Sequence, residues 1–419
     1  MSPSSMSAQF VSYVRQLRCV NCGAVYLPEK VSYTCPSCGP DVGILDVEYD
    51  MDAVARDLAI SDLLDGPQNH WRYGPLLPVT AHHIGVHWPI GWTPMVDAPL
   101  LAKLCGVKRL RLKDDSRNAS GSFKDRASSI GVVRAAESGA KAIACASTGN
   151  AAVSLAACSA MASMPAYIFV SQRIPEGKLA QLLIYGATVF RVNGSYDDAY
   201  KLCAAACEAF GWYNRNCAYN PYLVEGKKTG GLEIAEQCMT DPPDWVAMSV
   251  GDGCSIAGVA KGLKQMAELE LIDWSTRLLG VQAAGVAPIQ AIFETGEMGN
   301  ASGDTFADSI NCPVPRNIKK AVSAVRDSEG AYNSVTDDEI RWAMREVGRL
   351  AGIFAEPAAA AAVAGVAKAA RDGVIDSKAS VVAYISGNGL KDTPAAISAA
   401  GAPIDISPNL DEVKRAVKS

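Results

Sequence analysis

The sequence contains no long apolar run, no excess of positive charge and little histidine. No stretch of about 18 apolar residues occurs, so we expect no membrane-spanning helix. Lysine and arginine together number 39 against 44 aspartates and glutamates, which gives a net charge of −5. Without a basic excess to neutralise phosphates, we do not expect a nucleic-acid-binding protein. Residues 1–10 lack the basic and apolar regions of a secretory signal, so we expect none.

The four histidines offer little for metal binding. His82, His83 and His87 lie close together in the sequence, but no acidic or thiol partner stands at metal-ligand spacing from them. We interpret them as surface or packing residues. The remaining composition, with 49% hydrophobic and 20% charged residues over 419 positions, is that of a globular protein with about two to three domains.

Cysteine, in contrast, is abundant, with 13 residues in the chain. Nine are scattered, many of them in apolar or helical stretches such as those around Cys145 and Cys203. In a reducing compartment such residues act as small buried hydrophobic side chains. This use of cysteine predicts a cytoplasmic location.

The other four cysteines form two C-x-x-C pairs, Cys19 with Cys22 and Cys35 with Cys38. Four thiolates at this spacing suit a tetrahedral ion, and the glycine after each pair permits the tight turn that directs both sulfurs to one metal. We predict a zinc ribbon in residues 1–50. The ion would be structural, because four protein ligands leave no position for water. Two redox pairs or plain buried thiols are the alternatives.

From residue 139 onward, short apolar segments alternate with helical patterns. The expected strands are 107–112, 141–146, 165–170, 188–192, 245–250, 278–283 and 380–385, and the expected helices are 151–162, 178–185, 197–210 and 256–268. This alternation predicts βαβ units and parallel sheets. Residues 50–64 should form an earlier helix, and Asn150 is placed to cap the helix that follows it. Thr336 and Glu339 form a capping box for a later helix, and Pro357 should open another.

Lys124 follows a run of small residues, Ala119 to Ser122, that would bring the backbone close to a bound molecule. A lysine just after such a turn can reach that molecule. A surface loop with a solvated lysine is the alternative for this stretch alone.

Three further loops also contain small or glycine residues at positions where a ligand could bind. Ser147-Thr148-Gly149-Asn150 follows an expected strand and opens a helix, where the ligands of parallel sheets bind. Gly251-Asp252-Gly253-Cys254-Ser255 is a glycine-rich turn between a strand and a helix, a pattern typical of phosphate binding. A third loop, S-G-N-G-L-K-D, begins at Ser386 after the last core strand.

Residues 118–126, N-A-S-G-S-F-K-D-R, resemble the motif N-P-T-G-S-F-K-D-R of pyridoxal-phosphate enzymes of the tryptophan-synthase-β class, in the variant typical of threonine synthase. Residues 220–229, N-P-Y-L-V-E-G-K-K-T, resemble the threonine-synthase stretch N-P-Y-R-x-E-G-Q-K-T. The order of motifs matches across residues 91–392, and many threonine synthases carry an N-terminal cysteine knuckle. The resemblance implies an α/β fold of two doubly wound parallel-sheet domains, fold type II, with an N-terminal zinc ribbon.

The same resemblance divides the chain into three parts. Residues 1–50 form the ribbon, residues 51–130 and 225–419 form a large cofactor-binding domain, and residues 131–224 form a small α/β domain. A homodimer is implied by analogy with the family.

For the cofactor, pyridoxal 5′-phosphate, the resemblance implies that Lys124 carries it as a Schiff base, that Asn150 bonds the ring oxygen and that Ser386 meets the ring nitrogen. A serine hydroxyl cannot keep that nitrogen protonated as a carboxylate could, so the cofactor would be a milder electron sink, suited to elimination and replacement. Its phosphate would be held by Gly251, Asp252, Gly253, Cys254 and Ser255. The substrate would contact Ser122, Ser147, Thr148, Gly149 and Ala151.

Several positions depart from the threonine-synthase pattern. Ala151 and Ala218 stand where hydroxyl residues are expected, and Leu223 stands where arginine is expected. Losing a cation and two hydroxyls weakens the expectation of a phosphorylated substrate.

Asp252 stands where asparagine is expected, which places a carboxylate beside the cofactor phosphate unless the side chain turns away. Candidate compensating cations are Arg117, Lys113 and Lys227.

Three function classes follow from these residues. The first is threonine synthase, a lyase of amino-acid biosynthesis that converts O-phospho-L-homoserine and water to L-threonine and phosphate, with Lys124 moving protons at Cα and Cβ. The second is a paralogue that replaces the leaving group of another activated amino acid, as cysteate synthase does with O-phospho-L-serine and sulfite. The third is a binding protein that kept the fold, against which the intact Lys124 and Asn150 argue.

Overall fold

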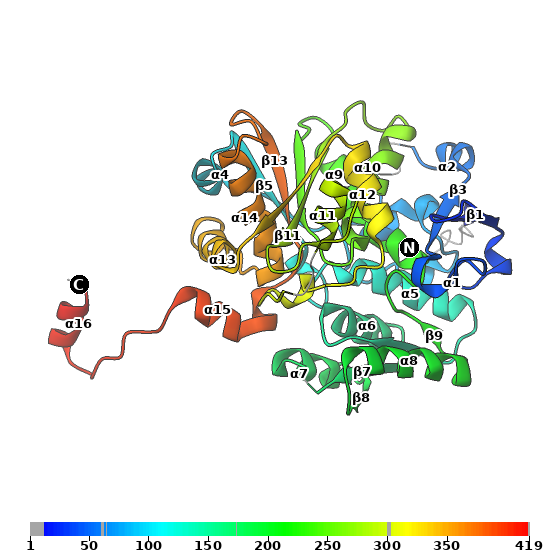
Figure 1. Ribbon diagram of the computed structural model, residues 1–419, viewed down its shortest axis with the longest axis horizontal. Coiled ribbons are helices and arrows are strands. Elements are labelled where there is room, and N and C mark those ends of the chain that lie inside the picture. The colour runs from blue at the N-terminus through cyan, green and yellow to red at the C-terminus, as the bar shows by residue number, and fades with distance from the viewer. Residues whose placement is uncertain (1–11, 60–62, 64, 173, 300–302, 418–419) are drawn as a thin grey trace, which may run out of the picture.

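The computed structural model describes residues 12–59, 63, 65–172, 174–299 and 303–417. Residues 1–10, which bear on a secretory signal, and part of the expected helix 50–64 lie outside the described residues. Within them, the strands form three sheets (Figure 1). None of the described helices combines the length and the apolar character that a bilayer crossing needs.

The largest sheet has six strands in the order β12-β11-β10-β13-β5-β4. Every neighbouring pair is parallel except the edge strand β4, which is antiparallel to β5. Its strands are β4 (Met95–Asp97), β5 (Arg109–Asp114), β10 (Trp245–Ser249), β11 (Arg277–Ala283), β12 (Ala331–Val335) and β13 (Ser380–Ile385). Because these strands are apolar on both faces, helices cover the sheet on both sides, as a doubly wound arrangement requires.

The helices that pack with this sheet begin and end close to glycine, proline or capping residues. They are α4 (Pro99–Cys105), α5 (Lys124–Glu137), α9 (Tyr222–Gln237), α10 (Cys254–Glu268), α11 (Pro288–Thr295), α12 (Ile318–Asp327), α13 (Asp337–Ala351) and α14 (Pro357–Arg371). The capping box of Thr336 and Glu339 is present at the start of α13, and Pro357 opens α14, as the sequence predicts.

The smaller sheet is wholly parallel, with the strand order β8-β7-β6-β9. It contains β6 (Ile143–Ala146), β7 (Ala166–Ser171), β8 (Thr188–Val192) and β9 (Tyr213–Asn214), with helices α6 (Asn150–Met161), α7 (Glu176–Ile184) and α8 (Tyr196–Phe210). One expectation is wrong here. Gly149, not Asn150, is the cap of α6, because Asn150 is already helical and its side chain makes its hydrogen bonds elsewhere.

Helix α9 lies at the centre of the core, buried from Tyr222 to Ala235. It touches α5 and α10 backbone to backbone. A Cβ at Gly226 would lie 2.0 Å from the carbonyl oxygen of Arg126 on α5, and a Cβ at Gly262 of α10 would lie 2.2 Å from the carbonyl oxygen of Lys228 on α9. Only glycine permits these contacts.

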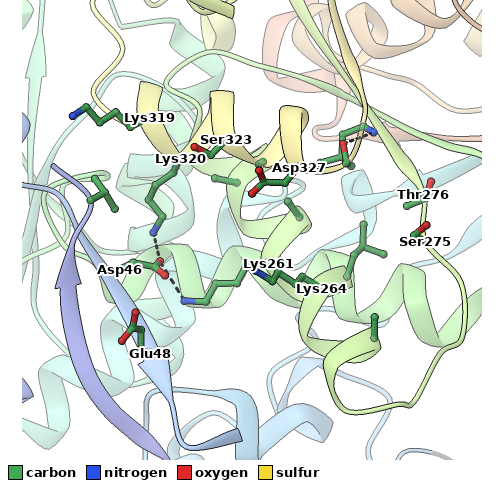
Figure 2. Close-up of a pocket in the computed structure, with 18 of the residues that line it drawn as sticks. Asp46, Glu48, Lys261, Lys264, Ser275, Thr276, Lys319, Lys320, Ser323 and Asp327 are labelled. Carbon is green, nitrogen blue, oxygen red and sulfur yellow. Dashed lines mark hydrogen bonds and ion pairs between the residues drawn. The ribbon is translucent and has the colours of Figure 1, made fainter. Parts of the chain in front are cut away.

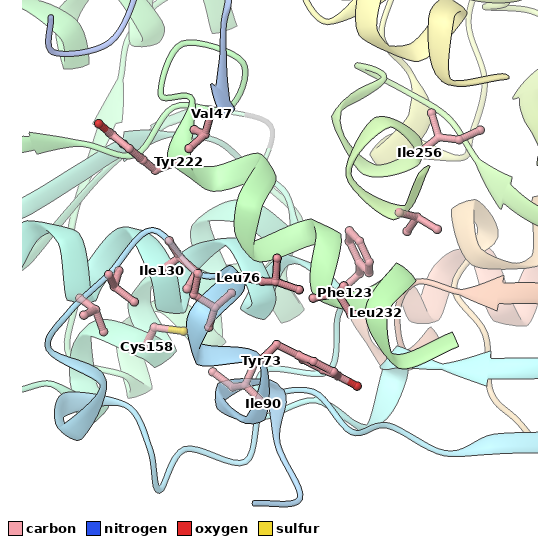
Figure 3. Close-up of a cluster of buried hydrophobic side chains, with 14 of the residues drawn as sticks. Val47, Tyr73, Leu76, Ile90, Phe123, Ile130, Cys158, Tyr222, Leu232 and Ile256 are labelled. Atoms are coloured by element: carbon pink, nitrogen blue, oxygen red, sulfur yellow. The ribbon is translucent and has the colours of Figure 1, made fainter. Parts of the chain in front are cut away.

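Around α5 and α9, apolar side chains from distant segments meet in one cluster (Figure 3). Tyr73, Leu76 and Ile90 come from the irregular segment before β4, while Ile130 and Leu232 come from the two helices. The early segment therefore covers α5 and α9 and completes the core.

The N-terminal segment folds as a small antiparallel sheet in the order β2-β1-β3. Its elements are β1 (Val14–Cys19), β2 (Val25–Tyr26), α1 (Gly39–Val42) and β3 (Leu45–Tyr49), and α2 (Met51–Asp57) follows, shorter than the helix expected over 50–64. Asp46 of β3 is ion-paired with Lys261 of α10 and Lys320 of α12 (Figure 2). These pairs join the N-terminal sheet to the rest of the chain beside a cavity of about 680 Å³.

The chain ends in α15 (Thr393–Ala400), an extended stretch and α16 (Leu410–Ala416), which stands away from the body (Figure 1). The division into domains by residue number stays a prediction.

Candidate active site

A cavity of about 130 Å³ lies beyond the carboxyl ends of β6, β10 and β13, where parallel sheets bind their ligands. All eight residues expected to bind the cofactor line it, although they come from four separate loops and helices. They are Lys124, Asn150, Gly251, Asp252, Gly253, Cys254, Ser255 and Ser386. The fold thus gathers the expected set in one place, while the role of each residue stays a prediction.

Of the residues expected to contact the substrate, only some line this cavity. Ala151 lines the same cavity. Ser147, Thr148 and Gly149 form the turn before α6 outside the described cavity lining, and Ser122 is completely buried with its hydroxyl unpaired.

Residues 251–255, here called the glycine loop, need glycine because the loop packs closely against neighbouring segments of the chain. Gly253 is the cap of α10 and has φ +87°, a left-handed conformation that favours glycine. A Cβ there would lie 2.8 Å from the Cβ of Ala321, and a Cβ at Gly251 would lie 3.1 Å from the Cα of Ile310. The loop lines the cavity and leads directly into a 15-residue helix whose first backbone N–H groups have no side-chain cap, which suits a phosphate group.

The carboxylate of Asp252 accepts a hydrogen bond at each of its two oxygens. Its Oδ1 accepts from the backbone N–H of Arg316 at 2.6 Å, and its Oδ2 accepts from the Cys254 thiol at 3.3 Å. Burial raises the pKa of Asp252. The side chain is thus engaged by the segment around Arg316, which reduces the conflict with an anion in the glycine loop.

Lys124 is the first residue of α5. Burial, reinforced by the nearby ammonium group of Lys227, lowers the pKa of Lys124 to about 8. About a quarter of such amines are neutral at pH 7.5. A neutral amine in a partly closed cavity can attack an aldehyde and can accept a proton.

A fully buried charge network fixes the start of α5. Arg126 donates to both oxygens of Asp115 at 2.7 and 2.8 Å and to both oxygens of Glu233 of α9 at 2.5 and 2.8 Å. Lys113 also donates to Glu233 at 2.6 Å. Because Arg126 lies two residues after Lys124, the network sets where the lysine projects.

Asn150 and Glu356 form the opposite wall. The Asn150 amide donates to both carboxylate oxygens of Glu356 at 2.8 and 2.9 Å, and its own oxygen is buried without a partner. That orphaned acceptor fits a hydroxyl group of a bound ring. A Cβ at Gly387 would lie 2.3 Å from Glu356 Oε1, so glycine beside Ser386 makes room for the carboxylate. Glu356 was missed in the sequence, where the Glu-Pro pair signals only a helix start.

The comparisons with known proteins bear on this site. A family model described as pyridoxal-phosphate dependent enzyme matches residues 88–387. The chain is 36% identical over 405 residues to threonine synthase of Methanosarcina acetivorans, covering 96% of this chain and 98% of that one. Threonine synthase of Methanocaldococcus jannaschii is 36% identical over 405 residues, covering 96% and 99%. The chain belongs to the threonine synthase family of pyridoxal-phosphate-dependent enzymes.

Solved structures agree on the fold. Threonine deaminase isoform 2 from Solanum lycopersicum superposes with a TM-score of 0.65 at 23% identity, covering 90% of this chain and 98% of that one. Maize serine racemase superposes with a TM-score of 0.62 at 19% identity, covering 78% and 92%. The predicted fold class, type II with parallel sheets, is confirmed.

Three residues that depart from the family pattern, Ala151, Ala218 and Leu223, do not all lie at the cavity. Leu223 is completely buried, and its Cδ2 lies 3.0 Å from where a Cβ on Gly131 of α5 would be, so it is a core residue rather than a cavity residue. Ala218, five positions before Leu223, is also buried. Its φ of +62° is strained for a residue with a Cβ. Only Ala151 of these three lines the cavity.

The cavity lining also contains Cys217, which had no expected role, and Lys227, which was expected only as a candidate compensating cation. Lys227 stands where the threonine-synthase stretch has glutamine, and the sequence signal was that single difference. Of the three candidate cations, Lys113 is committed to Glu233, while Lys227 is in the cavity lining.

The four clustered cysteines meet as expected for one metal. Their sulfur atoms all lie within 4.8 Å of one another, with 3.9 Å between Cys19 and Cys38 and 3.8 Å between Cys22 and Cys35. Zinc–sulfur bonds of about 2.3 Å in a tetrahedron place sulfur atoms about 3.8 Å apart. The cluster is therefore compatible with a zinc ion.

Proposed function

We propose that this enzyme carries out elimination and replacement on an O-phospho amino acid, with O-phospho-L-homoserine and water giving L-threonine and phosphate. The observation that carries the proposal is the convergence of Lys124, Asn150, the glycine loop and Ser386 on one cavity. The 36% identity to two threonine synthases over nearly the whole chain supports the choice of substrate.

In this proposal Lys124 would hold pyridoxal phosphate covalently, the glycine loop would hold its phosphate, and Asn150 and Ser386 would contact the ring. The cofactor, when bound, withdraws electrons from the amino acid and so weakens its Cα–H bond. The orphaned oxygen of Asn150 and the glycine loop at the start of α10 are the features that fit this ligand.

The residues then divide the work of proton transfer. With a pKa of about 8, Lys124 has enough neutral amine near pH 7.5 to take the Cα proton. After returning that proton to the substrate, it would take one from Cβ and deliver it to Cγ, from which the phosphate leaves. Glu356 holds the Asn150 amide with both oxygens, which fixes the orientation of the Asn150 oxygen toward the cavity. Overall, the substrate loses phosphate from Cγ and gains the elements of water.

A second candidate rests on Ala151, which lines the cavity where the family pattern has threonine. A wall without that hydroxyl favours a differently shaped amino acid. O-phospho-L-serine with a nucleophile such as sulfite is this second candidate.

We also infer that Cys19, Cys22, Cys35 and Cys38 bind one structural zinc ion, supported by their spacing. A homodimer and a cytoplasmic location are further proposals, supported by the family and by the many unpaired cysteines.

The test is phosphate release by the purified holoenzyme from O-phospho-L-homoserine and from O-phospho-L-serine, each with and without sulfite, with the amino-acid product identified by chromatography. We expect threonine from the first substrate, and no release by Lys124→Ala, while the exposed Lys264→Ala on α10 keeps full activity. Release only from O-phospho-L-serine would select the second candidate. No release from either would refute the proposed reaction.

A further inference from the structure

Two buried cations near Lys124 have no carboxylate partner. Lys227 of α9 and Arg215, just after β9, are only 2% and 1% exposed. Their shared contact is the Cys217 thiol, which accepts from Lys227 Nζ at 3.2 Å and from Arg215 Nη1 at 3.4 Å. Arg215 otherwise donates to the hydroxyl of Ser128. Among the described residues, neither cation forms an ion pair.

This arrangement differs from the other buried cations of the same core. Lys228, the next residue on α9, is paired with Glu225 at 2.6 Å, and Arg126 is paired with two carboxylates. Buried charges are normally compensated in this way, because an uncompensated one costs several kcal/mol. Among the described residues, Lys227 therefore lacks the carboxylate partner that other buried cations of this core have.

The missing anion has a place in the cavity. Lys227 and Cys217 both line it, together with Lys124 and the glycine loop. The Lys227 Cβ lies 2.8 Å from where a Cβ on Gly258 would be, so its stem crosses the first turns of α10. Burial lowers the pKa of Lys124 and raises that of Asp252, and the charge of the Lys227 ammonium group acts to lower both; these two residues also line the cavity. A cation in this position faces any anion bound between the lysine and the loop.

We propose that Lys227, supported by Arg215 behind Cys217, forms an anion subsite that binds a phosphoryl group in the Lys124 cavity. The proposal rests on the proposed function in that it takes this cavity as the active site. The phosphoryl group comes either from the cofactor or from the substrate, and both present the same dianion. In the absence of the ligand, Cys217 keeps the Lys227 ammonium group in position.

Two further observations agree with this role. Contact with the Cys254 side chain, with the charges of Lys227 and Arg215, holds the pKa of the Cys217 thiol well below its ordinary value, so without a ligand this thiol can carry the negative charge that a bound phosphoryl group would supply. A cation in the lining also offsets Asp252, and it supplies the positive charge that Leu223 cannot.

The first experiment compares wild type with Lys227→Met, which keeps the length of the stem and removes the charge, and with Lys264→Met as the exposed control on α10. The dissociation constants of the apoenzyme for pyridoxal phosphate and for pyridoxal, which lacks the phosphate, are measured by absorbance titration. If the subsite holds the cofactor, Lys227→Met weakens pyridoxal-phosphate binding roughly tenfold to a hundredfold and leaves pyridoxal binding unchanged. Lys264→Met should change neither.

A second experiment tests whether the phosphoryl group in the subsite comes from the substrate. Spectral titration of the holoenzyme compares O-phospho-L-homoserine with L-homoserine, and O-phospho-L-serine with L-serine. A loss confined to the phosphorylated ligand in Lys227→Met assigns the subsite to the substrate. If Lys227→Met changes neither the cofactor pair nor the substrate pairs, the proposal is wrong.

The last measurement does not depend on catalysis. The rate of iodoacetamide labelling of Cys217, followed by peptide mass spectrometry, is measured against pH with and without inorganic phosphate. The charged or titratable groups that face this thiol are Lys124, Arg215, Lys227, Asp252, Cys254 and Cys145. We expect labelling at lower pH than for an ordinary thiol, a shift to higher pH in Lys227→Met, and a changed rate with phosphate in wild type only.

If Lys227→Met does not change the pH dependence of Cys217 labelling, the contact between Lys227 and the Cys217 thiol is contradicted. If phosphate-dependent binding is lost in Lys227→Met but no phospho amino acid is turned over by wild type, the subsite stands and the proposed reaction falls.

Discussion

Glu233→Gln removes one charge from the buried network that fixes the start of α5. Glu233 accepts from Arg126, from Lys113 and from the backbone N–H groups of Trp92 and Thr93. The side chains of Arg126, Lys113 and Glu233 are all fully buried. The network is neutral, with Arg126 and Lys113 balanced by Glu233 and Asp115. The substitution leaves one positive charge uncompensated and turns an N–H₂ group toward donors.

Removing one partner of a buried ion pair costs about 3–5 kcal/mol. We expect Glu233→Gln to lower the free energy of unfolding by this amount, measured by urea denaturation followed by fluorescence and circular dichroism. Cofactor affinity should fall as well, because Arg126 positions the turn that carries Lys124. Glu48→Gln, which breaks the exposed pair with Arg18, is the control and should stay close to wild type.

The double variant Glu233→Gln with Lys113→Met restores neutrality and should regain part of the lost stability. The reasoning is refuted if Glu233→Gln costs less than about 1 kcal/mol, or if the second substitution adds its own full cost instead of recovering stability.

The pH dependence provides a separate check. Burial opposes ionisation, but Arg126 and Lys113 together hold the pKa of Glu233 well below its usual range. A carboxylate with a lowered folded-state pKa contributes stability above its unfolded pKa of about 4.3 and loses it as the pH falls below that value. The gap between wild type and Glu233→Gln should therefore be full at pH 6–8 and shrink below about pH 4.

Three other outcomes follow from the structure. Cys35→Ser should lower the metal content, measured by atomic emission, from about one zinc per chain and destabilise the N-terminal sheet; full metal content would exclude the four-cysteine site. Asp46→Asn should leave Lys261 with fewer partners and make the N-terminal sheet more sensitive to proteolysis, and an unchanged digestion pattern would show that this ion pair does not join the two parts. Leu223→Arg should be strongly destabilising in thermal melts, because Leu223 packs against Gly131 in the core, whereas a stable variant with faster phosphate release would return this position to the substrate pocket.

The sequence predicted the elements whose signals are local. The strands β6, β7, β8 and β10 and the helices α6, α7, α8 and α10 lie within about three residues of the expected bounds, because hydrophobic alternation and turn residues are read over short windows. The four loops that contribute residues to the cavity were singled out for the same reason, since each has glycine or a small residue at a particular turn. Their roles in ligand binding stay predictions. The short strand β12 and helix α12 were missed.

Contacts between distant segments were beyond such signals. The hydrogen bonds between Asn150 and Glu356 join residues 206 positions apart, and nothing near either residue indicates the other. For Leu223, the motif placed it near the substrate, yet an apolar side chain at the first turn of α9 is more stable in the core than in a polar cavity.

The glycine contacts of α9 have a consequence for the precision of the site. Helix α5 begins at Lys124 and α10 begins at the glycine loop, and both rest on α9 through backbone atoms at Gly226 and Gly262. A side chain between two helices could change rotamer and alter their spacing, whereas carbonyl groups in direct contact have no such freedom. The distance from the Lys124 amine to the glycine loop must match a ligand to within about 0.5 Å. Because the helix contacts are rigid, this distance should vary little with temperature or with substitutions elsewhere in the core.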